Sequence, residues 1–204
     1  MRERVLAWLA DNVPTSRLKH ILGVEQTAKE LAGIHHLDTE KAARAGLMHD
    51  LAKCFKPARL LQMAKEAEVE IDAVTEANPH LLHAQVSAIV AKNIFDERDT
   101  EVLEAIANHT LGKPGMSKLS CVVFVADCIE PTRGSSPELE ALRETSKHDL
   151  YKAVWLTCDY SLSFLLETRC LIHPQTIFTR NWALQKASQQ VVFGELAKDT
   201  YKTA

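Results

Sequence analysis

The chain has 204 residues, 46% of them hydrophobic, which is enough to fill the core of one domain. A net charge of only −3 argues against a surface built to bind a nucleic-acid polymer. The five cysteines include no C-x-x-C pair, so we expect free thiols in a reducing cytoplasm, and neither a disulfide scaffold nor a structural zinc site.

Two apolar segments of the chain lack the pattern of a targeting or membrane signal. The first, MRERVLAWLADNVP, carries charges before and after its apolar residues and predicts a short amphipathic helix instead of a secretory signal. The longest uncharged apolar stretch, residues 119–126, is far shorter than the roughly 20 residues of a membrane span. We therefore expect no membrane association.

Helical spacing of apolar residues runs through nearly the whole chain. The only strand-like runs, CVVFV and QVVFG, lie inside longer helical periods. After the first helix, the next is predicted at 17–33, with Thr15 or Ser16 as its N-cap. Asp38 caps a helix that carries His49 and Asp50 near its end, Pro57 opens another, and a further helix follows Pro79. Asp99 or Thr100 caps a helix that ends at His109, Ser117 caps the one after it, and the last two are predicted at 149–168 and 174–196. The fold class is therefore all-α, a single-domain helical bundle with a core of about 15–135 and C-terminal helices of about 149–196 packed on it.

Five predicted helical segments each contribute a histidine, an aspartate or an adjacent His-Asp pair, which are residue types that bind metals. They are His20, the pair His49 and Asp50, His83, His109, and Asp127. A bundle could point all six side chains into one pocket, and a pocket of imidazoles and carboxylates binds divalent metal. A structural polar cluster is the alternative that spacing alone leaves open.

A second His-Asp pair, His148 and Asp149, serves as an internal comparison. It lies in a charged stretch and predicts a solvated face or a helix start with Asp149 as N-cap. The pair His49 and Asp50 lies among small and apolar residues instead, where an ionised aspartate is costly unless it is paired or bound to metal.

Three cations are predicted beside the metal ligands. Lys53 is i+4 from His49, Arg17 is i−3 from His20, and Arg133 follows Asp127 at a helix end broken by proline and glycine. Taken singly, each is an ordinary surface cation. Together they would meet the oxygens of a bound phosphate, which favours phosphoryl chemistry.

Several longer stretches carry a resemblance to a known family. They read RLKHILGV at 17–24, LMHDLAK at 47–53, LLH at 81–83, NHT at 108–110, ADCIEPTR at 126–133, and IHPQT with RN within 172–181. Spread over about 165 residues, these stretches resemble the HD-domain metal-dependent phosphohydrolases and, more narrowly, the YqeK family of symmetrical diadenosine tetraphosphate hydrolases. The departures are Cys128, where an aromatic residue is expected, and Phe178 with Thr179 in the last stretch; they bear on nucleotide contacts.

The resemblance implies an HD-type bundle with two divalent transition-metal ions, iron first, with manganese, cobalt or nickel as alternatives. All six candidate residues would be ligands, with Asp50 as the bridge. A water held between the metals would attack an inner phosphorus of a dinucleoside polyphosphate and release ADP. The implied catalytic residues are Asp50, Lys53 and Arg133. The implied nucleotide and phosphate contacts are Arg17, His20, Asp50, Lys53, His83, Thr110, Arg133, Ile172, His173, Pro174, Thr176 and Arg180.

Other functions share this ligand set. Nucleotide phosphomonoesterases and guanosine polyphosphate hydrolases use it as well, and a nucleotide-binding regulatory module is the non-enzymatic alternative. A homodimer is one option for the assembly, which the sequence does not decide. His80 is expected to be exposed, and Trp8, Trp155 and Trp182 are expected in the core.

Overall fold

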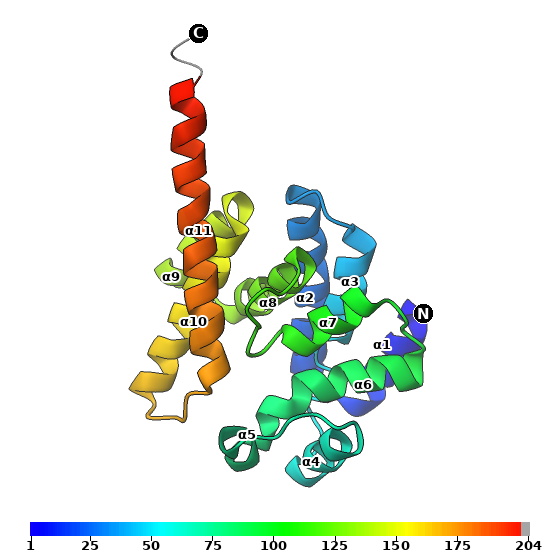
Figure 1. Cartoon of the computed structure of the whole chain (residues 1–204). Coiled ribbons are helices and arrows are strands. Elements are labelled where there is room, and N and C mark those ends of the chain that lie inside the picture. Colours follow the sequence, from blue (N-terminus) through cyan, green and yellow to red (C-terminus); the bar gives the residue numbers. More distant parts are fainter. Residues whose placement is uncertain (201–204) are drawn as a thin grey trace.

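The computed structural model describes residues 1–200, with side chains described through residue 188. Its elements are α1 (Arg2–Asn12), α2 (Thr15–Ile34), α3 (Thr39–Met48), α4 (Pro57–Glu66), α5 (Ala73–Ala77), the 3-10 turn η1 (Pro79–Leu82), α6 (His83–Phe95), α7 (Thr100–Asn108), α8 (Lys118–Ile129), the 3-10 turn η2 (Pro131–Arg133), α9 (Pro137–His148), α10 (Leu150–Glu167) and α11 (Pro174–Thr200) (Figure 1). Residues 1–200 contain no strand, which confirms the all-α fold class.

Helix starts follow the capping residues that the sequence offers. Asp38, Asp99, Ser117 and Asp149 each accept a hydrogen bond from a backbone N–H in the first turn of the following helix. Such caps satisfy N–H groups that have no partner inside the helix. The predicted cap of α2 is wrong, because its N-cap is Pro14 and the helix already begins at Thr15.

Two helices were absent from the predicted set. The first, α5, has only five residues, too few for a periodic pattern. The second, α9, has a mostly charged and polar sequence and buries only Leu139, Leu142 and Ser146, so its apolar stripe is thin. It is capped by Ser136, whose hydroxyl accepts from the backbone N–H of Leu139.

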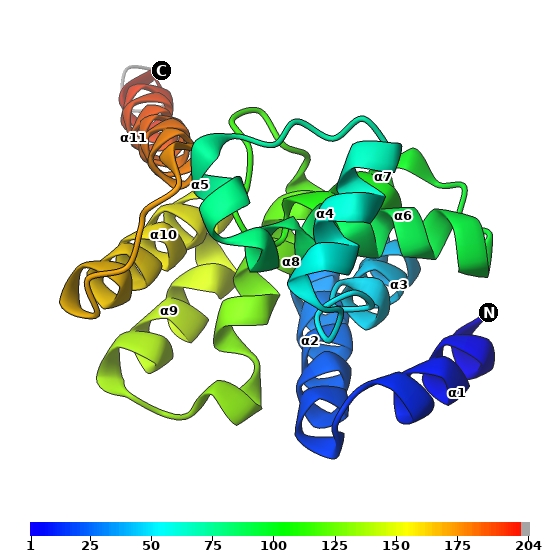
Figure 2. The same cartoon turned by 90° about the horizontal axis from the view of Figure 1, so that it is seen from below.

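Helix α8 is the central element of the bundle. It is apolar on all sides and buries every residue from Leu119 to Ala126, as expected for a helix surrounded by others. It packs against α2, α3 and α7 on one side and against α9 and α10 on the other. Figures 1 and 2 show α1, α2, α3, α6 and α7 on one side of it and α9 to α11 on the other.

A close approach of α2 and α3 brings two ligand-bearing segments together. A Cβ atom at Gly46 would lie 2.9 Å from the Cα atom of Glu25 on α2, so only glycine fits this crossing. His20 lies on α2, and His49 with Asp50 follows the end of α3. The crossing therefore holds these residues at a fixed separation.

One contiguous cluster of buried apolar side chains runs from Val5 of α1 to Ala183 of α11. A shared core is what a single domain requires, although the domain bounds stay a prediction. Trp8, Trp155 and Trp182 are partly buried against this cluster, as expected. Within the described residues, every helix is too short or too polar to cross a membrane.

Candidate metal centre and nucleotide cavity

The six predicted metal ligands meet in one buried cluster. His20 lies on α2, the His49 and Asp50 pair follows α3, His83 opens α6, His109 follows α7, and Asp127 lies on α8. The four histidines and Asp50 are each at most 5% exposed. Their ligand atoms form three overlapping triads, each with all atoms within 4.8 Å of one another: His20, His49 and Asp50; His49, His109 and Asp127; Asp50, His83 and His109.

Asp50 lies at the centre and turns its two oxygens to different histidines. Its Oδ2 is 3.5 Å from Nε2 of His49 and 3.9 Å from Nε2 of His20. Its Oδ1 is 3.2 Å from Nε2 of His83 and 3.6 Å from Nε2 of His109. Asp127 completes the cluster, with Oδ1 3.0 Å from Nε2 of His20.

All four imidazoles are held by their Nδ1 atoms. His49, His83 and His109 donate from Nδ1 to the backbone oxygens of Gly46, His80 and Ile106, at 2.7, 2.5 and 2.7 Å. His20 donates instead to the carboxylate of Glu130, at 2.9 Å. Because each Nδ1 atom carries a proton that it donates in a hydrogen bond, each Nε2 atom presents to the cluster either a lone pair or a second ring proton.

The cluster has more hydrogen-bond acceptor atoms than it has protons to donate to them. The Nε2 atoms of His83 and His109 face each other at 3.0 Å, and Nε2 of His49 is buried with no hydrogen-bond partner among the described side chains. Burial lowers the pKa of His83 to about 4, against the effect of Asp50, so at neutral pH its Nε2 is an unprotonated lone pair. Lone pairs and carboxylates converging in a buried site fit divalent cations.

Both aspartates are ionised despite their surroundings. Burial alone would raise the pKa of Asp50, but the imidazoles of His49, His109 and His83 outweigh burial and hold it well below its ordinary value. The pKa of Asp127 is also lowered, against the effect of burial, by its hydrogen bond with His20 and by nearby His49 and Arg133. The carboxylates are therefore available as anionic ligands over the whole neutral range.

The three predicted cations lie at the cluster. Arg17 pairs with Oδ2 of Asp50 at 2.9 Å, and the ammonium of Lys53 is 3.2 Å from Nε2 of His83. Arg133 donates to Oδ1 of Asp127 at 2.5 Å and to its backbone oxygen at 2.8 Å. The hydroxyl of Thr110 is also 3.2 Å from Nε2 of His83.

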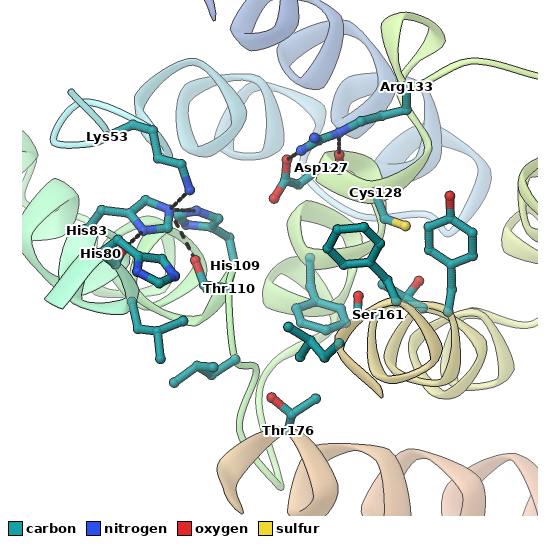
Figure 3. Close-up of a pocket in the computed structure, with 17 residues that line it drawn as sticks. Lys53, His80, His83, His109, Thr110, Asp127, Cys128, Arg133, Ser161 and Thr176 are labelled. Atoms are coloured by element: carbon teal, nitrogen blue, oxygen red, sulfur yellow. Dashed lines mark hydrogen bonds and ion pairs between the residues drawn. The ribbon is translucent and has the colours of Figure 1, made fainter. Parts of the chain in front are cut away.

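A cavity of about 560 Å³ opens from the cluster (Figure 3). Lys53, His83 and His109 line one end, and Asp127 and Arg133 line another part. The remaining lining comes from η1, the segment after α7, α8, α10 and the start of α11. A volume in this range suits one nucleotide. His80 also lines the cavity and is itself exposed, as expected for its side chain.

The stretch 172–181 is only partly at this cavity. Thr176 lines it, whereas His173 and Pro174 line a second cavity of about 430 Å³, where Nε2 of His173 pairs with Asp72 at 2.7 Å. Arg180 pairs with Asp159 at 2.9 Å, and neither Arg180 nor Ile172 is among the residues that line a described cavity. The structure therefore brings one of these five predicted nucleotide contacts, Thr176, to the cavity beside the metal cluster.

Sequence reasoning assigned no role to Glu130. Its carboxylate is fully buried and accepts from His20 Nδ1, from the backbone N–H of Thr132 at 2.7 Å and from the hydroxyl of Thr132 at 2.5 Å. Burial opposes its ionisation, yet the hydrogen bonds with His20 and Thr132 lower the pKa of Glu130. Its spacing was the available signal, because Glu130 is i+3 from Asp127 and so shares its helix face.

The comparison pair behaves as its sequence context predicted. His148 is exposed and pairs with Glu144, and Asp149 caps α10 through the backbone N–H of Lys152. Neither belongs to a metal-binding triad among the described residues. The surroundings of each pair, buried in one case and exposed in the other, therefore distinguish the two pairs, and the His-Asp dipeptide itself does not.

An all-helical bundle that gathers four histidines and two aspartates from five helical segments defines an HD-type metal centre. Residues 17–132 match the family described as HD domain. The symmetrical bis(5'-nucleosyl)-tetraphosphatase of Bacillus subtilis is 34% identical over 181 residues, covering 89% of this chain and 96% of that protein. The chain belongs to the HD domain family, in the branch of these symmetrical tetraphosphatases.

Two further relatives support membership of the HD family, and the first of them carries the tetraphosphatase name as well. The symmetrical bis(5'-nucleosyl)-tetraphosphatase of Halalkalibacterium halodurans is 33% identical over 183 residues, covering 90% of this chain and 97% of that protein. A crystal structure from Clostridium acetobutylicum, described as a predicted HD superfamily hydrolase involved in NAD metabolism, superposes with a TM-score of 0.87 at 35% identity, covering 91% of this chain and 98% of that one. The resemblance found in the sequence is therefore confirmed.

Proposed function

We propose that this protein hydrolyses diadenosine tetraphosphate symmetrically and releases two molecules of ADP. The observation that carries the proposal is the complete cluster of four histidines and two aspartates, flanked by three cations, at one end of a nucleotide-sized cavity. Relatives named symmetrical bis(5'-nucleosyl)-tetraphosphatase match nearly the whole chain, which supports the same reaction here.

The ligand cluster would hold two divalent transition-metal ions, with Asp50 as the bridge. The support for a bridge is that Oδ2 of Asp50 faces His20 and His49 while Oδ1 faces His83 and His109. A ligand set dominated by imidazole suits iron, manganese, cobalt or nickel better than magnesium, and we propose iron. When bound, the metal ions would supply an activated water and withdraw charge from the phosphoryl oxygens.

The protein's own cations would neutralise the phosphate chain. Lys53 and Arg133 both line the cavity and would contact phosphate oxygens as negative charge builds up on them during displacement. The leaving group is an ADP phosphate, which is stable as an anion, so a strong general acid is not required. Thr110, beside His83, would add a hydroxyl to the same phosphate site.

The arrangement also favours cleavage in the middle of the tetraphosphate. A small second opening of about 160 Å³ is lined by Ser16, Arg17, His20, Thr132 and Arg133. Arg133 lines this opening and the large cavity alike, and each of them is also lined by predicted metal ligands, His20 in the opening and His83, His109 and Asp127 in the cavity. One ADP half would occupy the large cavity, and the phosphates of the other half would leave past Arg17.

Metal analysis and product chromatography test the proposal. Protein purified without chelator should carry close to two transition-metal ions per chain and convert diadenosine tetraphosphate to ADP alone. Attack on an outer phosphate would give ATP and AMP instead. That product pair, or phosphate release from mononucleotides at higher efficiency, would contradict the symmetrical reaction, and an active protein with one zinc per chain would contradict the two-metal site.

A cytoplasmic location is a further expectation, and a homodimer stays one option for the assembly. The five cysteines are unpaired in the structure, which supports a reducing compartment. Light scattering of the purified chain would measure the assembly state. No nucleic-acid polymer or membrane is proposed as a partner.

A further inference from the structure

One face of α10 forms the wall of the large cavity, and none of its residues was among the predicted site residues. Thr157, Tyr160, Ser161, Phe164 and Leu165 all line the cavity. Their spacing of i, i+3, i+4, i+7 and i+8 places them on one stripe of the helix. Figure 3 shows Ser161 on α10 across the cavity from His83 and His109.

The aromatic side chains on this face are unusually exposed. Phe164 is 61% exposed and Tyr160 is 42% exposed, although the same side of α10 is buried in the earlier turns, at Ala153, Val154 and Cys158. Phe124 of α8 adds a third aromatic ring to the same cavity. Exposed aromatic rings that line a cavity beside a phosphate site are typical of a platform for a flat ring system.

A buried hydroxyl on the same face has no partner. Thr157 is 3% exposed, and its Oγ1 makes no hydrogen bond to any side chain or backbone group that the structure describes. Buried hydroxyls are normally hydrogen-bonded, so the unpaired Oγ1 of a residue at the cavity wall has hydrogen-bonding capacity left for a polar group of a ligand. The hydroxyl of Ser161 lies one helical turn further along the same face.

We propose that this α10 face binds the nucleobase of one half of the substrate while the metal cluster holds the phosphates. Phe164 and Tyr160 would stack on the base, and the hydroxyls of Thr157 and Ser161 would contact its edge. The inference rests on the proposed function only in placing phosphates at the cluster. It moves the main base contacts from the 172–181 stretch to α10.

The chemistry of the α10 face also defines a substrate class. Stacking on an aromatic ring is available to every base, and hydroxyl groups both donate and accept, so they suit the edge of adenine and of guanine. None of the α10 residues that line the cavity is charged, so none of them selects one purine by charge. Dinucleoside tetraphosphates that carry adenine or guanine therefore belong to one substrate class for this protein.

Equilibrium binding to the metal-loaded full chain tests the α10 face apart from turnover. The probes are ADP, GDP and pyrophosphate, which lacks a base. Phe164→Ala should weaken ADP binding about tenfold or more, as expected for the loss of a stacked ring, and Thr157→Val should weaken it about threefold or more. ADP and GDP should bind the wild type within about threefold of each other, and pyrophosphate should bind all variants equally.

Phe178→Ala is the matched control. Phe178 is 58% exposed, close to the value for Phe164, but it lies on α11 and lines the second cavity. Its removal should leave ADP binding unchanged. Unchanged ADP binding in Phe164→Ala would overturn the α10 site, and so would an equal loss of pyrophosphate binding. If Phe164→Ala changed the molecular mass in solution and left ADP binding unchanged, the α10 face would belong to a contact with a second copy of the chain.

The binding readout separates this inference from the proposed reaction. If diadenosine tetraphosphate gave ATP and AMP while Phe164→Ala still weakened ADP binding, the nucleobase site would hold and the symmetrical reaction would be wrong. If the products were ADP alone while Phe164→Ala left ADP binding intact, the reaction would hold and the α10 site would be wrong.

Discussion

Replacing Glu130 by glutamine should weaken metal binding without touching a predicted ligand. Glu130 accepts three hydrogen bonds, one from His20 Nδ1 and two from Thr132. Glutamine keeps only one acceptor oxygen, and its amide nitrogen would face a donor. If the amide nitrogen faces His20, the ring must move its proton to Nε2 or lose its Nδ1 partner, and either change impairs Nε2 as a metal ligand.

The size of the effect follows from this single contact. Loss of a hydrogen-bond partner behind a metal-bound histidine costs about 10-fold to 100-fold in metal affinity. At about 1.4 kcal/mol per factor of ten, this loss corresponds to roughly 1.5 to 3 kcal/mol. The range agrees with the roughly 1.5 to 3 kcal/mol assigned to one hydrogen bond to a charged group.

Gly23→Ala gives an independent route to the same effect. A Cβ atom at Gly23 would lie 2.4 Å from Oε2 of Glu130, so alanine must push the carboxylate away from its position. Gly23 and His20 lie on the same helix, and the change leaves every predicted ligand in the sequence. Both variants should therefore lose metal affinity by similar factors.

Metal titration by calorimetry, on protein stripped with chelator, measures this affinity directly. Circular dichroism of the stripped variants checks that they are folded. Glu140→Gln is the control, because Glu140 is an exposed carboxylate of α9 that, among the side chains described through residue 188, pairs only with Arg143, at 2.6 Å. Wild-type metal affinity in both folded variants, Glu130→Gln and Gly23→Ala, would refute the role assigned to Glu130.

Three further predictions concern the cluster itself. Asp50→Ala should abolish metal binding and turnover together, whereas Asp149→Ala should leave both near wild type; equal losses measured by metal analysis and activity would show that the wrong pair was chosen. Lys53→Ala and Arg133→Ala should each lower turnover about tenfold or more with metal content retained, a factor of ten being about 1.4 kcal/mol of transition-state stabilisation, and steady-state kinetics that match wild type would contradict their role. In metal-stripped protein, urea unfolding should show stability falling as the pH drops from 6.5 to 4, because unfolded His83 takes up a proton near 6.5 and folded His83 only near pH 4. At about 1.4 kcal/mol per pH unit, this gap corresponds to about 3 kcal/mol, and an unchanged pH dependence in His83→Gln would contradict the assignment.

The sequence by itself determined the helices and the identity of the clustered ligands. Caps such as Asp38, Asp99 and Ser117 start helices through hydrogen bonds to the next few residues, so a local pattern is enough to find them. The six ligands could also be predicted from the sequence, because four histidines and two aspartates on apolar helices have few roles other than metal binding. The helix α9 was missed because its three buried residues leave little pattern to detect.

Only the tertiary structure decided what surrounds the cluster. The Glu130 carboxylate reaches His20 across 110 residues of sequence, in a space that Gly23 leaves open, and no local pattern encodes that meeting. The cavity wall is a second case, since an apolar stripe on α10 predicts burial until packing leaves Phe164 exposed. The third case is α11, whose position depends on a hydrogen bond from Thr179 to the backbone oxygen of Leu111 at 2.9 Å. With α11 in this position, Thr176 lines the cavity, whereas Arg180 pairs with Asp159 outside it. Contacts between distant helices depend on how whole faces pack together, and that information is spread over the entire chain.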